Sequence, residues 1–514
     1  MKKLIVVSLL SLSIILPNGS LDSQRVDDLT RALVLSRQGQ YEAASKLLFQ
    51  LSLNPRYAPK RNQVKYILGL MLFQMNLYQT SAFQLISVVK KSDPKYTKQS
   101  LEKLSLAADF LGDDTLLNYA ISKVNVRDFP RAHRDMLNYR IGEFQMRNGQ
   151  LKDAAVSFSR VNELSNFYPK AKYFEGLAYT ELNQLDLALT TFDSLIEFRS
   201  KGLQSINDPS RVSAIAGKAR VLYQTKKWEQ AIEAYRMIPR DSPVFHDSLF
   251  ELSWSMLRSG KFRSALSNFQ SLHSNFYEDF YMPESLLLRS IVYLYICQYE
   301  EMDKVLKLFT KTYQPIYKSL VQYLSAEQKP LNYYADVVTP MREFIAKGDK
   351  YDRKKSRIPF QLVYKVFREG DFQSNYAYIK SLEEEIQRME KLTPEWRESS
   401  LGRYASKVIK NRLIKAQAKT GRLIRAHFIA SRSELFDLFE QEGFIRYEQL
   451  QGKKDDLKTT QAKKKLEIKD KDKEKKERDF YIQNGFEYYP FQGEFWLDEL
   501  GNYHYVGESN CPKN

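Results

Sequence analysis

The sequence predicts an all-α protein: a right-handed solenoid of stacked helix pairs, then a long helical hairpin and a short aromatic C-terminal β-hairpin. The main observation is one position that recurs at intervals of 34 to 43 residues, usually with a small side chain. Its eight members are Ala44, Ser81, Asn118, Ala154, Ala188, Ala231, Ala265 and Met302. One helix pair cannot bury its apolar face alone, so a period in this range indicates stacked pairs.

Turn and stop signals support the same period. Glycines at Gln38-Gly39-Gln40, at 148–150 and at 259–261 are expected to form the turn inside a pair, because glycine tolerates positive φ. Prolines that follow second helices are expected to end them. These are Pro55, Pro94, Pro243 and Pro315.

The clearest unit spans residues 219–243. Spacings of three and four place Trp228, Ala231, Tyr235 and Ile238 on one helical face. This layout resembles a tetratricopeptide repeat, and the resemblance covers about residues 25–315. The units around Asn118 and Met302 are degenerate, and the longest interval contains an insertion near 202–209. Such repeats imply a surface for binding other proteins.

The predicted domain organisation has five parts. A signal peptide at 1–20 precedes the tetratricopeptide-like solenoid at 21–315. An irregular helical cap and a basic helical hairpin follow at 316–450, with helix breaks expected at Pro330, Pro340 and Pro359. Residues 451–479 are rich in Lys, Asp and Glu, and form either a charged linker or a helix extension. Residues 480–514 form an aromatic C-terminal element.

The N-terminus has the order of a secretory signal. Lys2 and Lys3 precede an apolar stretch from Leu4 to Leu16, which the polar residues 17–20 follow. The stretch is shorter than the ~20 residues that span a bilayer, so an uncleaved anchor is the weaker interpretation. No cysteine lies nearby to accept a lipid. We therefore expect a periplasmic or secreted protein.

The most polarised segment is Leu401 to Ala430, which contains no acidic residue. Its candidate anion-binding residues are Arg403, Lys407, Lys410, Arg412, Lys415, Lys419, Arg422 and Arg425. Together with a net charge of +17, they indicate an anionic membrane, a cell-wall polymer or an acidic protein as partner. In the alternative interpretation the cations are only solvated and are answered by Glu383, Glu384 and Glu385 on the preceding helix.

Two cysteines are present, Cys297 and Cys511. An oxidising compartment permits a disulfide, but spacing alone does not show one. Cys297 follows the apolar run Ile291 to Ile296, so we expect it to be a small core residue of a helix.

Aromatic residues return near the C-terminus. The candidate docking residues are Tyr488, Tyr489, Phe491, Phe495 and Trp496. Alternation around Gly501-Asn502 predicts a β-hairpin. Two strands are marginal alone, so this element either docks on a partner or folds back on its own helices.

The tail pattern Tyr488-Tyr489-Pro490-Phe491, with Phe495-Trp496 and Gly501-x-Tyr503, gives a second resemblance. With the signal, the repeats and the basic helix, the chain is similar to periplasmic gliding-motility-associated repeat proteins of Gram-negative bacteria. The resemblance implies a non-catalytic scaffold of a cell-envelope machine, with no cofactor, metal or small-molecule substrate.

Chemistry-bearing motifs do not point to an enzyme. The five histidines lack metal-ligand spacing, and no phosphate loop or nucleophile elbow is present. The alternative function is a basic surface that binds the envelope or cell wall, or nucleic acid if the protein is not exported. Candidate residues of a groove on the first helices are Lys65, Asn138, Arg140, Tyr173 and Arg220.

Overall fold

A computed structural model of the chain describes residues 27–91, 95–107, 131–198, 209–326, 328–457 and 494–503, together with 505, 509 and 511. Helices account for all regular structure in this part of the chain. The helices of the repeats are α1 (Asp28–Arg37), α2 (Tyr41–Leu53), α3 (Arg61–Gln74), α4 (Tyr78–Val89), α5 (Thr97–Leu106), α8 (Arg131–Arg147), α9 (Leu151–Ser159), α10 (Tyr168–Glu181), α11 (Leu185–Glu197), α12 (Pro209–Gln224), α13 (Trp228–Arg236), α14 (Phe245–Ser259), α15 (Phe262–Leu272), α16 (Pro283–Tyr295) and α17 (Tyr299–Ser325).

Each described pair turns at a residue with positive φ. The turn residues are Gly39, Asn76, Gly149, Asn183, Lys226, Gly260 and Cys297. Each lies five residues before a member of the recurring small position, and those members are buried where the structure describes them. The next residue donates its N–H to a carbonyl of the first helix, as Gln40 does to Leu35. This bonding satisfies carbonyls that the helix end leaves open.

Glycines let the paired helices approach closely. A Cβ on Gly142 would lie 2.6 Å from the ring of Phe158, and one on Gly176 would lie 2.5 Å from Phe192. Both rings are almost fully buried. The tetratricopeptide-like packing expected from the sequence is therefore present: a small residue on the first helix faces an aromatic residue on the second.

Two prolines were wrongly expected to interrupt helices. Pro315 lies inside α17, which continues to Ser325, and Pro340 lies inside α18. Pro55 does follow the end of α2, and Pro330 begins α18. Tertiary packing keeps both helices continuous, because apolar residues are buried on either side of each proline. Asn118 and Pro94 lie outside the described residues.

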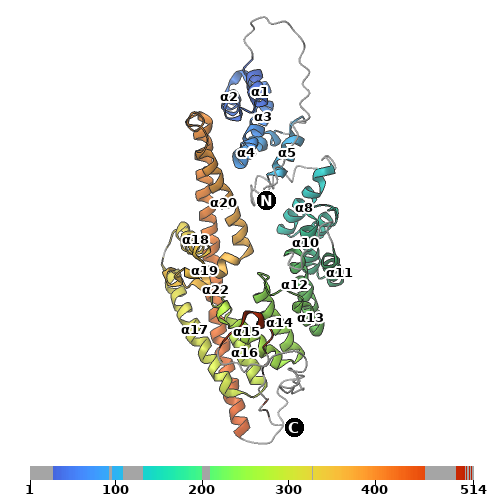
Figure 1. Cartoon of the computed structure of the whole chain (residues 1–514), viewed down its shortest axis with the longest axis vertical. Coiled ribbons are helices and arrows are strands. Elements are labelled where there is room, and N and C mark those ends of the chain that lie inside the picture. Colours follow the sequence, from blue (N-terminus) through green and yellow to red (C-terminus); the bar gives the residue numbers. More distant parts are fainter. Residues whose placement is uncertain are drawn as a thin grey trace.

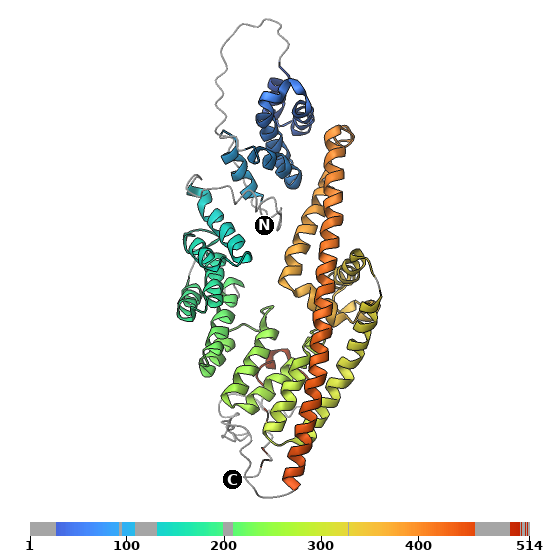
Figure 2. The same ribbon diagram turned by 180° about the vertical axis from the view of Figure 1, so that it is seen from behind.

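The C-terminal helices form a brace along the repeats. They are α18 (Pro330–Lys347), α19 (Phe360–Arg368), α20 (Gly370–Glu390), α21 (Pro394–Arg397) and α22 (Ser400–Leu457). Helices α20 and α22 pack along each other as the predicted hairpin. At 58 residues, α22 is about 90 Å long. Figures 1 and 2 show it as a long rod with α17 and α18 on one side and α8 to α13 on the other.

The brace reaches both ends of the repeat stack. Near its beginning, Leu401, Ala405 and Ile409 share a core with α1 to α4. Further along, four residues of α22 join the core of the last repeats and α18 to α20: Ile424, Phe428, Leu435 and Leu438. One continuous helix therefore fixes the distance between the first repeats and the last.

Two buried side chains attach the first repeats to the brace. The indole N–H of Trp396 donates to Ser45 Oγ at 3.0 Å, and the ring is fully buried. Glu385 accepts from the backbone N–H groups of Gln79 at 2.7 Å and Thr80 at 2.9 Å. These are free donors of the first turn of α4, so Glu385 caps that helix from another element.

Substitution of Gly421 by alanine should loosen the brace. A Cβ there would lie 1.8 Å from the backbone carbonyl oxygen of Pro330, and backbone cannot move aside cheaply. We expect Gly421→Ala to lower the free energy of unfolding by at least about 2 kcal/mol. Gly443→Ala on the same helix is the control, because no atom lies within 4 Å of its Cβ position. Denaturant unfolding should show it unchanged or stabilised by up to about 1 kcal/mol; equal losses would contradict the packing.

Removal of the Glu385 carboxylate should weaken the junction with α4. Glu385→Ala leaves two backbone donors without their acceptor, at a cost of about 1–3 kcal/mol. Burial raises the pKa of Glu385, although the hydrogen bonds from Thr80 and Gln79 oppose this. The folded state therefore binds the proton of Glu385 more tightly than the unfolded state. The difference in the free energy of unfolding between the wild type and Glu385→Ala should shrink as pH rises through that raised pKa.

The matched control is Glu384→Ala, which removes only an i,i+4 ion pair with Arg388. Thermal unfolding of the three proteins between about pH 4 and about pH 8 tests the prediction. An equal effect of the two substitutions would show that the cap is not formed.

Candidate interaction surface

The predicted basic residues occupy the outer side of α22. Seven of the eight are exposed: Arg403, Lys407, Lys410, Lys415, Lys419, Arg422 and Arg425. Within the described residues, none of these seven has an ion-pair partner. Their charges therefore face solvent over about 33 Å of helix.

Arg412 differs from the other seven. Its guanidinium lies between elements, 4.5 Å from the centroid of the Phe83 ring, and donates to Tyr378 Oη at 3.1 Å and Gln79 Oε1 at 3.3 Å. It connects α22 with α4 and α20. The structure thus places Arg412 inside the junction and not with the exposed cations.

The three glutamates considered as partners are used elsewhere. Glu383 pairs with Arg342 at 2.8 Å, and Glu384 pairs with Arg388 on its own helix at 3.0 Å. Glu385 is buried against α4. None of the three neutralises the exposed cations of α22, so the interpretation of an internally answered charge is not supported.

The opposite side of α22 is the apolar side that the sequence indicates. Ala405, Ile409 and Thr420 are fully buried, and Leu413, Ala416 and Leu423 are half-buried. The helix is therefore already seated on its own chain. Any partner of the basic face meets a docked helix, with Ile414 as an exposed apolar residue among the cations.

The C-terminal tail folds back on the last repeats. Leu500 is buried in their core, and Tyr503 and Tyr505 pack against the same core. The N–H groups of Gly501 and Tyr505 donate to Ser271 Oγ at 2.7 Å and to Ser267 Oγ at 2.9 Å. Burial raises the pKa of Tyr505 to about 12. Sequence reasoning missed these serines, because nothing in their own pattern distinguishes them from other helical serines.

The β-hairpin expected here is not found in the described part of the tail. Residues 497–499 form a short 3-10 helix, and Gly501 takes a φ of 82° in the turn that follows. In the described part of the tail, backbone groups bond to side chains and not to a partner strand: Gly501 and Tyr505 donate to serines of α15, and Trp496 donates to Tyr503 Oη. Of the candidate docking residues, Trp496 is 61% exposed and Phe495 is half-buried; Tyr488, Tyr489 and Phe491 lie outside the described residues.

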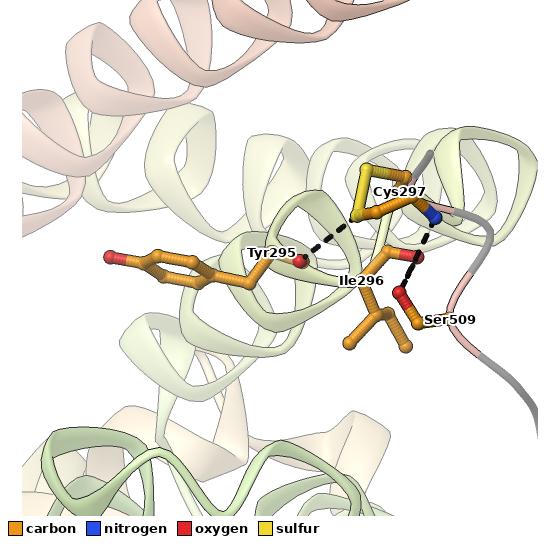
Figure 3. The surroundings of a disulfide bond; sticks show 5 residues. Tyr295, Ile296, Cys297 and Ser509 are labelled. Atoms are coloured by element: carbon orange, nitrogen blue, oxygen red, sulfur yellow. Dashed lines mark hydrogen bonds between the residues drawn. A yellow bond between two sulfur atoms is a disulfide. The ribbon is translucent and has the colours of Figure 1, made fainter. Parts of the chain in front are cut away.

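A disulfide joins Cys297 to Cys511, so the expectation of a free core cysteine is wrong (Figure 3). Cys297 lies after α16, at the positive-φ turn position of its repeat. Ser509 Oγ also lies 3.4 Å from the carbonyl oxygen of Ile296. The period could have located Cys297, because it lies five residues before Met302 and 37 after Gly260. That spacing places it in a turn and not in a helix.

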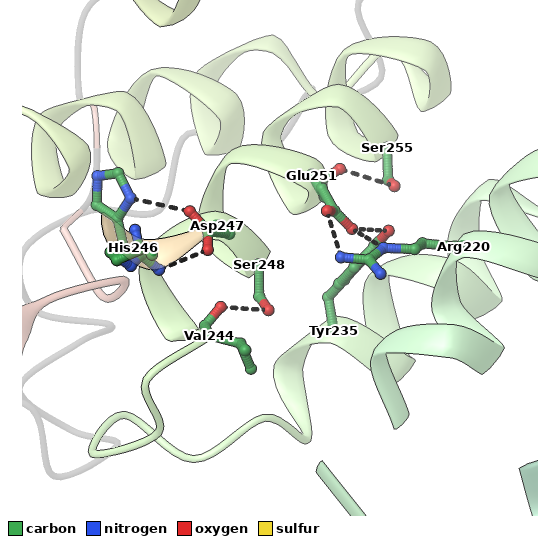
Figure 4. A network of polar contacts seen from close by, with 9 residues as sticks. Arg220, Tyr235, Val244, His246, Asp247, Ser248, Glu251 and Ser255 are labelled. Atoms are coloured by element: carbon green, nitrogen blue, oxygen red, sulfur yellow. Dashed lines mark hydrogen bonds and ion pairs between the residues drawn. The ribbon is translucent and has the colours of Figure 1, made fainter. Parts of the chain in front are cut away.

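The candidate groove residues make contacts inside the chain. Arg220 forms two hydrogen bonds with Glu251, which also accepts from Tyr235 Oη at 2.8 Å (Figure 4). These bonds join α12, α13 and α14. Burial raises the pKa of the Tyr235 hydroxyl, and the negative charge of Glu251 raises it further. Arg140 pairs with Glu143 within α8, whereas Lys65 of α3 donates to Ser87 of α4 and so joins the two helices of its repeat.

A second polar group joins the repeats to α19. Arg368 pairs with Asp247 at 2.8 Å and stacks on the Phe280 ring. The neighbouring His246 is buried against Tyr277 and Phe280, and burial lowers its pKa (Figure 4). An adjacent hollow of about 230 Å³ is lined by Asp247, Phe280, Arg368 and Lys365, among others. Arg368 pairs with Asp247 and Lys365 pairs with Glu434 of α22, which indicates a structural junction.

Within the described residues, no three His, Cys, Asp or Glu side chains are placed to hold a metal ion. Among the helices of this part of the chain, none has the length and apolarity of a membrane span.

Comparisons with known proteins give only distant structural matches. No family model and no curated protein matches the chain. A point variant of a Podosopora anserina kinesin light chain with nearly identical TPR-like repeats matches at 16% identity and a TM-score of 0.30, covering 35% of this chain and 98% of that one. The P58(IPK) TPR domain matches at 11% identity and a TM-score of 0.18, covering 76% and 97%. The geometry described above is that of a TPR-like helical repeat protein.

Loss of the disulfide should destabilise the last repeats. Cys511→Ser and Cys297→Ser break the same bond, which closes a loop across 214 residues of sequence. Each should lower stability by about 2–4 kcal/mol, and addition of a dithiol to the wild type should have the same effect. Thermal unfolding measures this. Two free thiols in the oxidised, denatured protein would contradict the bond.

Proposed function

We propose that this protein is a non-catalytic scaffold that holds proteins of the cell envelope together. TPR-like repeats generally bind proteins, and the described part of the chain is built of such repeats. The single observation that carries the rest is the exposed basic face of α22: seven cations that have no ion-pair partner among the described residues, on a helix that is already fixed on its other side. A rigid row of like charges is suited to an anionic partner.

Export from the cytoplasm is part of the proposal. Its support is the order of charged, apolar and polar residues at 1–20 and the disulfide between Cys297 and Cys511, since disulfides persist in oxidising compartments. Membership of the gliding-motility-associated periplasmic proteins rests on the tail pattern from Tyr488 to Tyr503. Fractionation of cells that express the tagged protein tests the compartment.

The partner is inferred to be an acidic protein of the envelope. Between Arg403 and Arg425 the exposed large apolar side chains are Tyr404, at 38%, and Ile414, at 52%, and they lie four residues or more from each other among the cations. A helix that lies in a bilayer interface normally presents a broad apolar face to the lipid, and the apolar side of α22 is already buried in the protein. The second candidate, an anionic wall polymer or lipid surface, is favoured only by the charge.

Charge reversal on α22 should abolish partner binding. The variant replaces four exposed cations by glutamate: Lys407→Glu, Lys415→Glu, Lys419→Glu and Arg422→Glu. None of the four has an ion-pair partner to lose within the described structure. We expect capture of the partner by crosslinking in intact cells to fall at least about tenfold, with helical content unchanged. Arg412 is left intact because it belongs to the junction with α4.

A matched control changes the net charge equally at other places. Lys152, Lys170, Lys311 and Lys318 are exposed on the repeats, and their reversal should leave capture unchanged. If both variants lose capture of the partner equally, binding depends on the net charge of the protein and not on the basic face of α22. Retained crosslinks with loss of binding to anionic vesicles or wall fragments would instead favour the second candidate.

A further inference from the structure

The seat of the C-terminal tail on α14 to α16 has the features of a peptide-binding site. The tail segment from Leu500 to Tyr505 follows α15, where Ser271 meets Gly501 and Ser267 meets Tyr505. The two serines lie one helical turn apart, so the tail runs opposite to the helix. We propose that this surface binds a segment of a partner protein, and that the tail is its internal, disulfide-tethered occupant.

Main-chain groups make the polar contacts. Each serine hydroxyl donates to its own helix, Ser267 to the carbonyl of Arg263 and Ser271 weakly to that of Ser267, and each accepts an N–H from the tail. Both hydroxyls are therefore used as donor and acceptor at once. Because backbone N–H groups occur in every peptide, these contacts fix position and direction but do not select side chains.

Side-chain selection comes from three places on the tail. Leu500 is 2% exposed and joins the core of the last repeats. Gly501 has a φ of 82°, and a Cβ there would lie 3.4 Å from Leu249. Tyr505 meets the ring of Tyr293 edge-on, with centroids 6.1 Å apart. The matching ligand is an apolar residue, a glycine in a turn, and an aromatic residue four positions beyond the glycine.

The disulfide between Cys297 and Cys511 controls how easily such a ligand can displace the tail. Cys511 holds the end of the tail at the turn before α17, so the disulfide keeps the tail close to its seat and a ligand must compete with a tethered occupant. A reduced tail remains on the same chain and competes at an effective concentration on the order of millimolar. Opening consumes one dithiol, which is oxidised to its own disulfide while Cys297 and Cys511 each gain a proton and an electron.

This inference is separate from the basic face of α22. The seat lies on α14 to α16 and involves none of the seven exposed cations. It adds a partner site to the proposed scaffold, and its test uses a different surface. Failure of the charge-reversal experiment would therefore leave it standing, and its own failure would leave the basic face unaffected.

The test uses the full-length protein and a fluorescent peptide of residues 494–511 that carries Cys511→Ser. The open variant combines Leu500→Asp with Cys511→Ser, so that the tail is neither seated nor tethered. We expect the peptide to bind the open variant and to show at least about tenfold weaker binding to the oxidised wild type. Fluorescence anisotropy measures both, and circular dichroism confirms that the two proteins have equal helical content.

Three substitutions establish that binding uses this seat. Ser267→Ala with Ser271→Ala in the open variant should weaken binding about tenfold, and Gly501→Ala in the peptide about fivefold or more. The control is Ser259→Ala, a buried serine of α14 whose hydroxyl donates to Met256. No binding to a folded open variant, equal binding to the oxidised wild type, or no effect of the serine substitutions would each overturn the proposal.

Discussion

The structure depends on the packing of one long helix against both ends of a repeat stack. Repeats contact only their neighbours, so the first and last units of a solenoid expose an apolar face that something must cover. Here α20 to α22 cover the first repeats through Trp396, Glu385 and the apolar residues of 401–409. The same α22 enters the core of the last repeats at 424–438.

This packing has a mechanical consequence. A free solenoid bends easily, because small rotations between units add up along the stack. A helix attached at both ends opposes such bending, since a change in curvature would have to break buried contacts at one end. The close approaches of Gly402, Gly421 and Gly452 to neighbouring elements fix the position of α22 along its length. The repeats are thus held at a set spacing, which suits the scaffold role that we propose.

The two candidate surfaces have different physical characters. The basic face of α22 is exposed, charged and already rigid, so it can attract a partner over the range of a Debye length without conformational change. The tail seat is covered and neutral, and it recognises main chain and shape. With both kinds of surface, the proposed scaffold can hold one partner continuously and bind another more readily once the disulfide is reduced.

The sequence by itself determined the repeat. The spacing from Ala44 to Met302, the glycine turns and the basic run on α22 are local patterns, and local geometry dictates where such residues lie in a helix. Long-range contacts decided the rest. Helices α17 and α18 continue through Pro315 and Pro340 because other helices bury apolar residues before and after each proline. Glu385 serves α4 and not the cations. Cys297 and Cys511 meet because the tail returns to α16. Partners hundreds of residues apart leave no periodic signal, so only packing in three dimensions identifies them.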